Sequence, residues 1–234
     1  AMFTTRPCSS KPLCCWTNAM ARSCAWRAVV NWPRKLARAS SNAETSLPRS
    51  FNRPIRSSIL DASRSARSSS VCGAAQRGAG RDCSFGLNIK LPFEQKANET
   101  IDGDPKLVNF NYFFTRKLNF VKEAHAVTLF PGGFGTMDEG FEALTLMQTG
   151  KSRIMPLIMV DQPGGKYWKT FMTFLREHLL RNGLVSETDF HLLAVTDSVD
   201  EAVAHILRFY SNFASYRWVG KKMVLRVRRK LSEA

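Results

Sequence analysis

Residues 84–213 alternate between short apolar segments and longer amphipathic ones, and this alternation constrains the fold more than any other feature of the chain. Short apolar runs predict strands at 84–92, 126–130, 154–160 and 190–197. Apolar residues that recur every three or four positions predict helices at 104–124, 137–150, 167–183 and 198–213. Strands and helices joined in this order by short links form a parallel sheet with helices on both faces. We therefore predict an α/β fold with a Rossmann-like parallel sheet.

The helix at 104–124 is predicted from both its start and its period. Asp104 is placed to cap the helix, and Pro105 would occupy its first helical position. The apolar residues that recur at intervals of three or four in this segment are Leu107, Phe110, Phe114, Leu118 and Val121. These residues would form one buried stripe on a continuous helix.

Two further helices carry informative first residues. In the segment 198–213, Ser198 precedes Glu201 by three positions, which is the spacing of a capping box. Tyr167 and Trp168 open the helix at 167–183, and we expect both aromatic rings to pack in the core.

The chain changes character near residue 84. Residues 1–83 contain 14 Ser and 12 Arg but no Tyr, and their apolar residues keep no regular period for long. Three interpretations stay open: a disordered basic tail, an organellar transit peptide, or a stretch translated out of frame. We therefore divide the chain into an atypical basic segment (1–83), an α/β domain (84–215) and a basic C-terminal strand or tail (216–234).

The net charge of +15 is concentrated in the two ends of the chain. Residues 1–83 carry 14 Lys and Arg against 3 Asp and Glu, and residues 216–234 carry 7 against 1. Residues 84–215 carry 13 against 15, so the predicted domain is slightly acidic. A nucleic-acid-binding domain clusters basic residues on its folded surface. We therefore expect no nucleic-acid partner despite the basic ends.

The cysteines give no sign of a metal site or of secretion. All six lie in residues 1–83, without a CxxC spacing and without a histidine nearby, so no zinc site is expected. The first residues contain no secretory hydrophobic segment, and no apolar run reaches about 18 residues. We expect a cytoplasmic protein with reduced thiols and no membrane association.

A glycine-rich turn joins the predicted strand at 126–130 to the helix that follows it. The turn reads PGGFGT (131–136), and ligands of parallel sheets bind at such carboxyl ends of strands. Glycines let backbone N–H groups approach a phosphate closely, and the start of a helix adds partial positive charge. Thr136 could donate its hydroxyl to a phosphate oxygen. The turn lacks the Gly-Lys-Ser/Thr of a P-loop and is not a GxGxxG motif.

Two acids, Asp138 and Glu139, follow this turn directly. Acids in the first turn of a helix ordinarily stabilise its dipole, by about 0.3–1 kcal/mol each. Beside a phosphate site, however, they would repel the phosphate. A carboxylate in this position is useful when it faces a sugar, because it can stabilise an oxocarbenium-like centre as a glycosidic bond breaks.

The stretch PGGFGTMDE (131–139) fits the pattern PGGxGTxxE, which is the signature of the Lonely Guy (LOG) family. The family also carries an Arg-Lys pair on the preceding helix. The stretch FTRK (114–117) supplies that pair, with Arg116 lying 23 residues before Glu139. The chain therefore resembles this family at both of its marks.

The resemblance covers about residues 84–225. Two stretches resemble the longer bacterial branch of the family: GLNIKLPFEQ (86–95) and RFYSNFASYRWVG (208–220). LOG proteins are cytokinin riboside 5′-monophosphate phosphoribohydrolases that are often labelled lysine decarboxylases. The resemblance implies hydrolysis of a nucleoside 5′-monophosphate, of the AMP or cytokinin riboside type, to free base and ribose 5-phosphate. It implies no metal or organic cofactor, and a homodimer.

The resemblance also assigns roles to residues of this chain. Glu139 is the essential carboxylate near the ribose, and Arg116 orients the substrate or Glu139. An arginine beside Glu139 should keep its carboxylate ionised, which suits stabilisation of a cationic sugar. The residues implied to hold the 5′-phosphate are Gly132, Gly133, Gly135 and Thr136.

The family pattern is not readable before residue 84. The family expects two strands there and a GGGPGxMEAAnxGA motif, of which only AAQRGA (74–79) is echoed. Either residues 1–83 fold in a form that these patterns do not reveal, or two strands and part of the pocket are missing and a sheet edge is exposed. In the second case the alternative function is a nucleotide-binding module without turnover.

Overall fold

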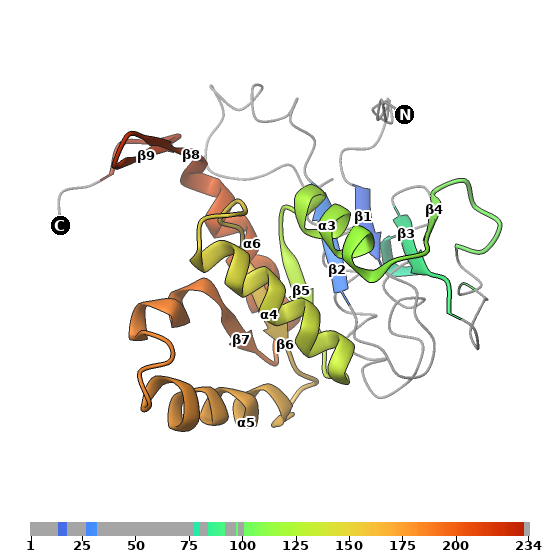
Figure 1. The fold of residues 1–234 in the computed structure, drawn as a ribbon, viewed down its shortest axis with the longest axis horizontal. Helices are drawn as coiled ribbons and strands as arrows, with labels where there is room; N and C mark the ends of the chain where they lie inside the picture. Colours follow the sequence, from blue (N-terminus) through green and yellow to red (C-terminus); the bar gives the residue numbers. More distant parts are fainter. Residues whose placement is uncertain are drawn as a thin grey trace.

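The structure, a computed structural model, describes residues 14–17, 27–31, 77–79, 84–91, 97 and 101–231. Seven strands form one sheet in the order β4-β3-β1-β2-β5-β6-β7 (Figure 1). Their bounds are β1 Cys14–Thr17, β2 Arg27–Asn31, β3 Ser84–Ile89, β4 Leu107–Phe110, β5 Val127–Leu129, β6 Leu157–Val160 and β7 Ala194–Thr196. Most of residues 1–83, and with them the three interpretations of that segment, lie outside the described residues.

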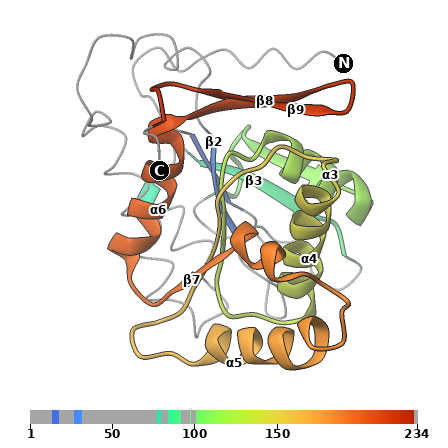
Figure 2. The same cartoon turned by 90° about the vertical axis from the view of Figure 1, so that its left-hand side faces the viewer.

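Helices cover both faces of this sheet. They are α3 Phe113–Glu123, α4 Phe134–Gln148, α5 Tyr167–Phe174 and α6 Val199–Asn212. In Figure 2, α3 and α4 lie on one side of the strands and α6 lies on the other, with α5 at the end of the molecule opposite β8 and β9. The predicted α/β class is confirmed. None of the described helices is both long and apolar enough to cross a membrane.

The sheet is parallel except around β2. Parallel pairing joins β1 to β3, β3 to β4, β5 to β6 and β6 to β7, whereas β2 runs antiparallel to both β1 and β5. Of the two alternatives for residues 1–83, the one with two missing strands and an exposed edge does not hold, whereas the other, that this segment folds in a form the patterns do not reveal, agrees with the sheet. Two strands from the first 83 residues occupy the centre of the sheet, and the edge of β5 is paired with β2.

The helix predicted at 104–124 is shorter than expected. Its first residues form β4, which pairs in parallel with β3 from Gly86↔Leu107 to Ile89↔Phe110. Asp104 caps a turn instead of a helix, because its carboxylate accepts the Lys106 backbone N–H at 2.9 Å. Residues 107–110 pair with the edge of β3 and therefore do not form helical hydrogen bonds. Helix α3 begins only at Phe113, where the sheet pairing has ended.

This shift also changes which residues of the segment are buried. Two members of the predicted stripe, Phe114 and Leu118, are 66% and 62% exposed. The buried residues of α3 are Arg116, Phe120 and Val121. Of the three stripe residues that lie in α3, Val121 is buried and Phe114 and Leu118 are exposed, so the stripe does not coincide with the core-facing side of the helix.

Two other predicted elements have different bounds. The helix at 167–183 continues beyond α5 as a π-helix at Leu175–Leu180, and the strand at 190–197 shortens to β7. The preceding residues form a 3-10 helix at Glu187–Leu192, which begins with a capping box between Ser186 and Asp189. This cap stabilises the start of the 3-10 helix, whose last residues (190–192) take the place of the beginning of the predicted strand.

The predicted cap of α6 is confirmed with one addition. The Ser198 hydroxyl accepts the Glu201 backbone N–H at 3.3 Å. The Glu201 carboxylate accepts the Thr196 hydroxyl, and that hydroxyl in turn accepts the Ser198 N–H at 3.0 Å. The capping box therefore closes through the last residue of β7, which ties α6 to the sheet.

The main core lies between the sheet and the layer of α3, α4 and α5. Its buried residues are Leu87, Phe120, Val121, Ala124, Val127, Leu129, Ala143, Met147, Met155, Leu157, Met159 and Trp168. On the opposite face, α6 buries Ala202, Val203 and Ile206. Because Val127 and Leu129 face α3 and α4, the end of β5 is held firmly where the glycine-rich turn begins.

A separate hairpin follows α6. It consists of β8 Phe213–Val219 and β9 Lys222–Val227, joined by a turn in which Gly220 has a φ of 59°. The Tyr216 hydroxyl donates to the Ser152 carbonyl at 2.8 Å, so the hairpin rests on the turn that follows α4. Most of the predicted basic C-terminal segment lies in this hairpin.

Candidate active site

The glycine-rich turn lies at the carboxyl end of β5 and opens α4. Gly133 caps the helix, and its carbonyl accepts the N–H groups of Thr136 at 3.0 Å and Met137 at 3.3 Å. The helix was predicted to begin at Met137, but it begins three residues earlier, at Phe134. Gly135 and Thr136 therefore belong to its first turn. The Thr136 N–H already donates to Gly133, whereas the N–H groups of the residues before it have no partner within the helix.

The four predicted phosphate-binding residues differ in exposure. Gly133 is exposed, Gly132 and Gly135 are half-buried, and Thr136 is fully buried. The Thr136 hydroxyl has no hydrogen-bond partner among the described residues. A buried hydroxyl without a partner costs about 1–3 kcal/mol. The turn thus combines accessible backbone N–H donors with the Thr136 hydroxyl, which donates to no described residue.

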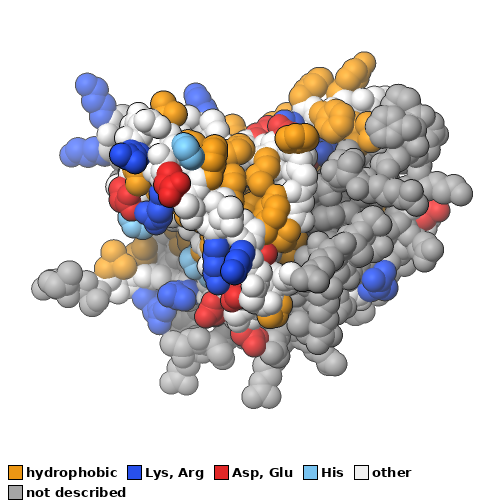
Figure 3. Space-filling view, turned by 90° about the horizontal axis from the view of Figure 1, so that it is seen from below, with side chains coloured by type: hydrophobic (Ala, Val, Ile, Leu, Met, Phe, Trp, Pro, Cys, Tyr) orange, Lys and Arg blue, Asp and Glu red, His pale blue; other side chains and the backbone are white. Residues whose placement is uncertain are grey.

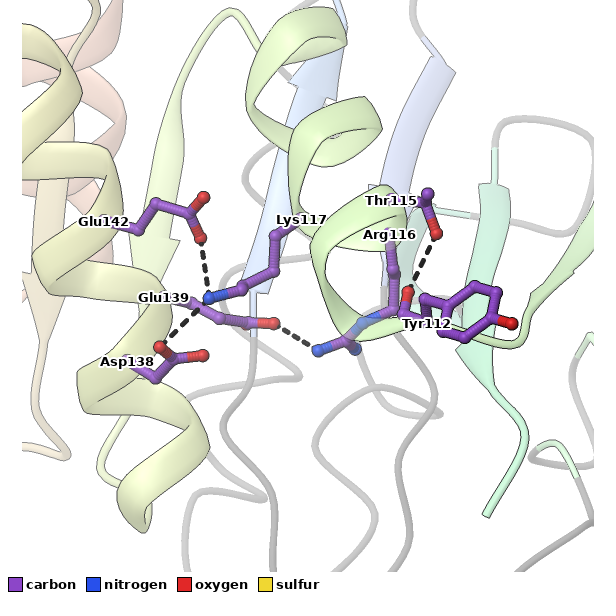
Figure 4. Close-up of polar contacts among 7 residues, drawn as sticks. All are labelled: Tyr112, Thr115, Arg116, Lys117, Asp138, Glu139 and Glu142. Carbon is purple, nitrogen blue, oxygen red and sulfur yellow. Dashed lines mark hydrogen bonds and ion pairs between the residues drawn. The ribbon is translucent and has the colours of Figure 1, made fainter.

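Arg116 and Glu139 meet in the interior beside this turn. The Arg116 Nη2 lies 2.5 Å from the Glu139 Oε1, and each side chain is 3% exposed (Figure 4). Arg116 comes from the buried side of α3, and its guanidinium lies 5.5 Å from the centre of the Phe113 ring. The structure therefore brings the two predicted catalytic residues together, although 23 residues separate them in the chain.

The position of Glu139 follows from how closely α4 approaches the sheet. The buried residues of α4 are Thr136, Glu139, Gly140, Ala143 and Met147, which form one helical face. At Gly140 a Cβ atom would lie 2.9 Å from a Leu129 methyl group, so the absence of a side chain lets α4 sit directly on β5. This packing carries Glu139 inward.

A buried ion pair of this kind adds little net stability, because removing both charges from water offsets their attraction. Removing only one partner costs much more, about 3–5 kcal/mol, because the other charge stays buried and unpaired. An ionisable pair buried beside a glycine-rich turn at the end of a strand is a candidate for function. The Arg116–Glu139 pair at the start of α4 is therefore more informative about chemistry than about folding.

A second ion pair explains the neighbouring acid, Asp138. The Lys117 Nζ lies 3.1 Å from the Asp138 carboxylate and 3.1 Å from that of Glu142 (Figure 4). Burial alone would lower the pKa of Lys117, but the hydrogen bonds and charges of the two carboxylates outweigh it and raise the pKa above its usual value. The Arg-Lys pair of α3 thus binds three acids of α4, and only Glu139 is buried among them.

Tyr167, the first residue of α5, reaches the glycine-rich turn. Its hydroxyl donates to the Gly132 carbonyl. We predicted that Tyr167 and Trp168 both pack in the core. Trp168 does so, with 1% exposure, but Tyr167 is 36% exposed and belongs to the site. No local motif distinguishes the two aromatic residues, so this contact could not be predicted from the sequence.

Asp161 fixes the start of α5. Its carboxylate is buried at the end of β6 and accepts the Trp168 backbone N–H at 2.9 Å. Gly165 passes so close that a Cβ atom there would lie 2.6 Å from the Asp161 Oδ1. This capping contact orients the first turn of α5 and places Tyr167 beside the glycine-rich turn.

An open pocket of about 460 Å³ lies between α4 and α5. Its lining residues are Met137, Lys166, Tyr167, Thr170, Phe171 and Phe174. Within the described part of the chain, no three or more His, Cys, Asp or Glu side chains are grouped so that they could hold a metal ion.

Comparison with known protein families identifies the chain. Residues 69–206, more than half of the sequence, match the family described as possible lysine decarboxylase. The matched region contains β3 to β7, the glycine-rich turn, the Arg116–Glu139 pair and Tyr167. It begins at residue 69, five residues before the stretch AAQRGA (74–79) that echoes the upstream family motif. Comparison with curated proteins gives no match. The chain therefore belongs to the possible lysine decarboxylase family, which is the LOG family that its PGGxGTxxE motif resembles.

Proposed function

We propose that this protein hydrolyses the N-glycosidic bond of a nucleoside 5′-monophosphate, of the AMP or cytokinin riboside type, and releases the free base and ribose 5-phosphate. The observation that carries the proposal is the buried Arg116–Glu139 pair directly beside the glycine-rich turn. A phosphate on the turn would bring the attached ribose toward the acid one helical turn further along. Membership of the LOG family supports the same reaction class.

In this reaction the bond between C1′ of the ribose and the base nitrogen breaks, water adds to C1′, and the base leaves with a proton. Positive charge develops on the sugar ring in the transition state. The Glu139 carboxylate stabilises that charge, and Arg116 holds the carboxylate in place. The first N–H groups of α4 bind the 5′-phosphate, because a helix start is an anion site. The unused Thr136 hydroxyl adds a further donor.

The family description also names lysine decarboxylation. Lys117, the lysine beside the site, is unsuited to forming the Schiff base on which such a reaction would depend. A lysine that forms a Schiff base must lose its proton readily, which burial or a neighbouring cation promotes. Lys117 instead binds two carboxylates, and its pKa is raised. Its ammonium group therefore stays protonated and serves to join α3 to α4.

Incubation of the full-length protein with AMP, with free adenine measured by chromatography, tests the proposal. We expect adenine release by the wild type and a loss of about a hundredfold or more in Glu139→Gln and Arg116→Ala, since each removes charge stabilisation at the reacting centre. Matched controls are Glu142→Gln, one turn further along α4, and Arg176→Ala on an exposed pair. Both controls should keep most of the activity.

Adenine release that survives both Glu139→Gln and Arg116→Ala would contradict the proposal. The alternative function is a nucleotide-binding module without turnover. One observation favours it, namely that the Glu139 side chain is only 3% exposed, so a substrate must open the Arg116 contact to reach it. Binding of AMP by the wild type without adenine release would establish this alternative.

The proposed enzyme acts as a homodimer in the cytoplasm. Apolar side chains exposed on α3 and at the start of α4 support association of two copies. On α3 these include Phe114 and Leu118, which lie one turn apart on the same side of the helix, and at the start of α4 Phe134 is 94% exposed.

A further inference from the structure

We propose that Tyr167 is a positioning residue for the glycine-rich turn, which it holds in the conformation that binds phosphate. The inference rests on the proposed function, because it takes the ligand of the turn to be the 5′-phosphate of a nucleotide. Tyr167 does not touch the reacting atoms in this scheme. It acts through the Gly132 carbonyl, to which its hydroxyl donates.

The geometry of the peptide unit explains why this carbonyl matters. The Gly132 carbonyl and the Gly133 N–H belong to one planar trans peptide, so they point in opposite directions. With the carbonyl held toward Tyr167, the Gly133 N–H must point away from α5. The N–H groups of Phe134 and Gly135 have no partner within the helix, because these residues open α4. The Gly133 N–H becomes a third donor for the phosphate beside them.

The same contact removes a repulsive group from the anion site. A glycine peptide can rotate easily, because glycine populates backbone conformations that other residues avoid. If the peptide between Gly132 and Gly133 turned over, a carbonyl oxygen would replace an N–H donor at the phosphate. The Tyr167 hydroxyl stabilises the orientation that presents a donor, so the turn is organised before the ligand arrives.

Tyr167 can perform this role because its own position is fixed. The neighbouring Trp168 is buried, its backbone N–H is bound by Asp161 at 2.9 Å, and its ring lies 4.8 Å from the Tyr167 ring in an edge-to-face arrangement. Asp161 is itself attached to β7, since its N–H donates to the Thr196 carbonyl at 2.8 Å. The contact on Gly132 therefore links the turn to two strands of the sheet through α5.

The phenol also keeps the proton that it donates. Burial is the main reason that the pKa of Tyr167 lies above its usual value, and the charge of Asp161 acts in the same direction. The hydroxyl is consequently a donor throughout the neutral pH range. Phenylalanine at this position would keep the ring and lose only the bond to Gly132.

The test compares Tyr167→Phe with a matched control, Tyr216→Phe. Tyr216 also donates its hydroxyl to a backbone carbonyl, that of Ser152, but near the opposite end of α4. Hydrogen exchange of the ligand-free, full-length proteins should show faster exchange of the amides of residues 132–136 in Tyr167→Phe and no change there in Tyr216→Phe. This measurement needs neither substrate nor turnover.

Titration with ribose 5-phosphate and steady-state kinetics with AMP complete the test. Tyr167→Phe should raise the Kd for ribose 5-phosphate and the KM for AMP about tenfold, as expected for one lost orienting bond, while kcat changes much less. A residue needed only for folding would instead lower the amount of active enzyme and leave KM unchanged. Tyr216→Phe should match the wild type in both constants.

Two results would overturn the inference: unchanged exchange of residues 132–136 in Tyr167→Phe, or unchanged affinity for ribose 5-phosphate. A wild type that binds ribose 5-phosphate but releases no adenine would refute the proposed turnover alone, and the exchange and binding results would still decide the role of Tyr167. A wild type that binds neither ribose 5-phosphate nor AMP would refute both, because the turn would then hold no phosphate.

Discussion

At the scale of single residues, adjacent side chains on α3 perform different tasks. Arg116 points into the interior and meets the buried Glu139, whereas Lys117 reaches the partly exposed Asp138 and Glu142. Both contacts join the same two helices and lie side by side (Figure 4). The buried contact carries the proposed chemistry, and the outer contact fixes the distance between α3 and α4.

Lys117→Met should therefore destabilise the protein. We expect the free energy of unfolding to fall by about 1 kcal/mol, because one half-buried ammonium group contacts two carboxylates. Urea denaturation at low salt measures this change, and added salt should reduce it. The control is Arg176→Met, which breaks an ion pair whose side chains are 52% and 66% exposed and should change the free energy very little. Equal effects of the two substitutions would contradict this explanation.

At the scale of elements, the connection between β6 and α5 is as specialised as the glycine-rich turn itself. Asp161 ends one element and caps the next, and Gly165 lies against its carboxylate. A side chain at residue 165 would meet the Asp161 carboxylate and also the Gln162 backbone carbonyl, at 2.9 Å. The backbone carbonyl cannot move aside without displacing the whole connection.

Gly165→Ala should thus disturb the start of α5. We expect a loss of about 1–3 kcal/mol in the free energy of unfolding, which is typical of overpacking at a closely packed site. Because Tyr167 moves with α5, the affinity for ribose 5-phosphate should fall as well. Urea denaturation and calorimetric titration measure the two effects. An unfolding midpoint equal to that of the wild type would show that the connection relaxes freely.

The sequence predicted the elements whose pattern and partners agree. Buried strands such as β5 and β6 are short apolar runs, and a capping residue, Ser198, marks the start of α6. The strand β4 was missed because its residues also fit a helical period, and only the pairing with β3 decides between the two. β1 and β2 lie in a segment without a clear period, so their pairing was not predictable.

The candidate site divides in the same way. Arg116 and Glu139 could be named from a motif, because the family pattern specifies both residue types and their order along the chain. The partners of Asp138 and the contact of Tyr167 depend on how α3 and α5 pack beside α4, which no local pattern encodes. The burial of Thr136 likewise follows from the close approach of α4 to the sheet.

At the scale of the whole molecule, apolar side chains remain on the surface. In the view from below, hydrophobic side chains gather in a band across the described surface, bordered by charged groups (Figure 3). A contiguous band of exposed apolar side chains is typical of an interface. On α3, Phe114 and Leu118 are the most exposed apolar residues, although the helix has a buried side of its own. This exposure is consistent with the proposed homodimer.

Leu118→Asp should dissociate that dimer. The residue is 62% exposed, so a charge there should leave the fold intact while opposing burial against a second copy. Light scattering after size exclusion should show the wild type at twice the mass of one chain, 26.3 kDa, and the variant at that single mass. The control is Leu184→Asp, which changes an equally exposed leucine (71%) outside α3 and should stay dimeric. A wild type of single mass would contradict the proposal.

The hairpin of β8 and β9 has a practical consequence. Its tip, Gly220 and Lys221, is exposed and lies beyond the strands that pair. The hairpin rests near the end of α4, whereas the glycine-rich turn opens the beginning of that helix, about 22 Å away for 15 residues. Exposed tips accept insertions with little cost to the fold. A peptide tag or surface anchor placed between these two residues would immobilise the protein with its reacting end directed into solution.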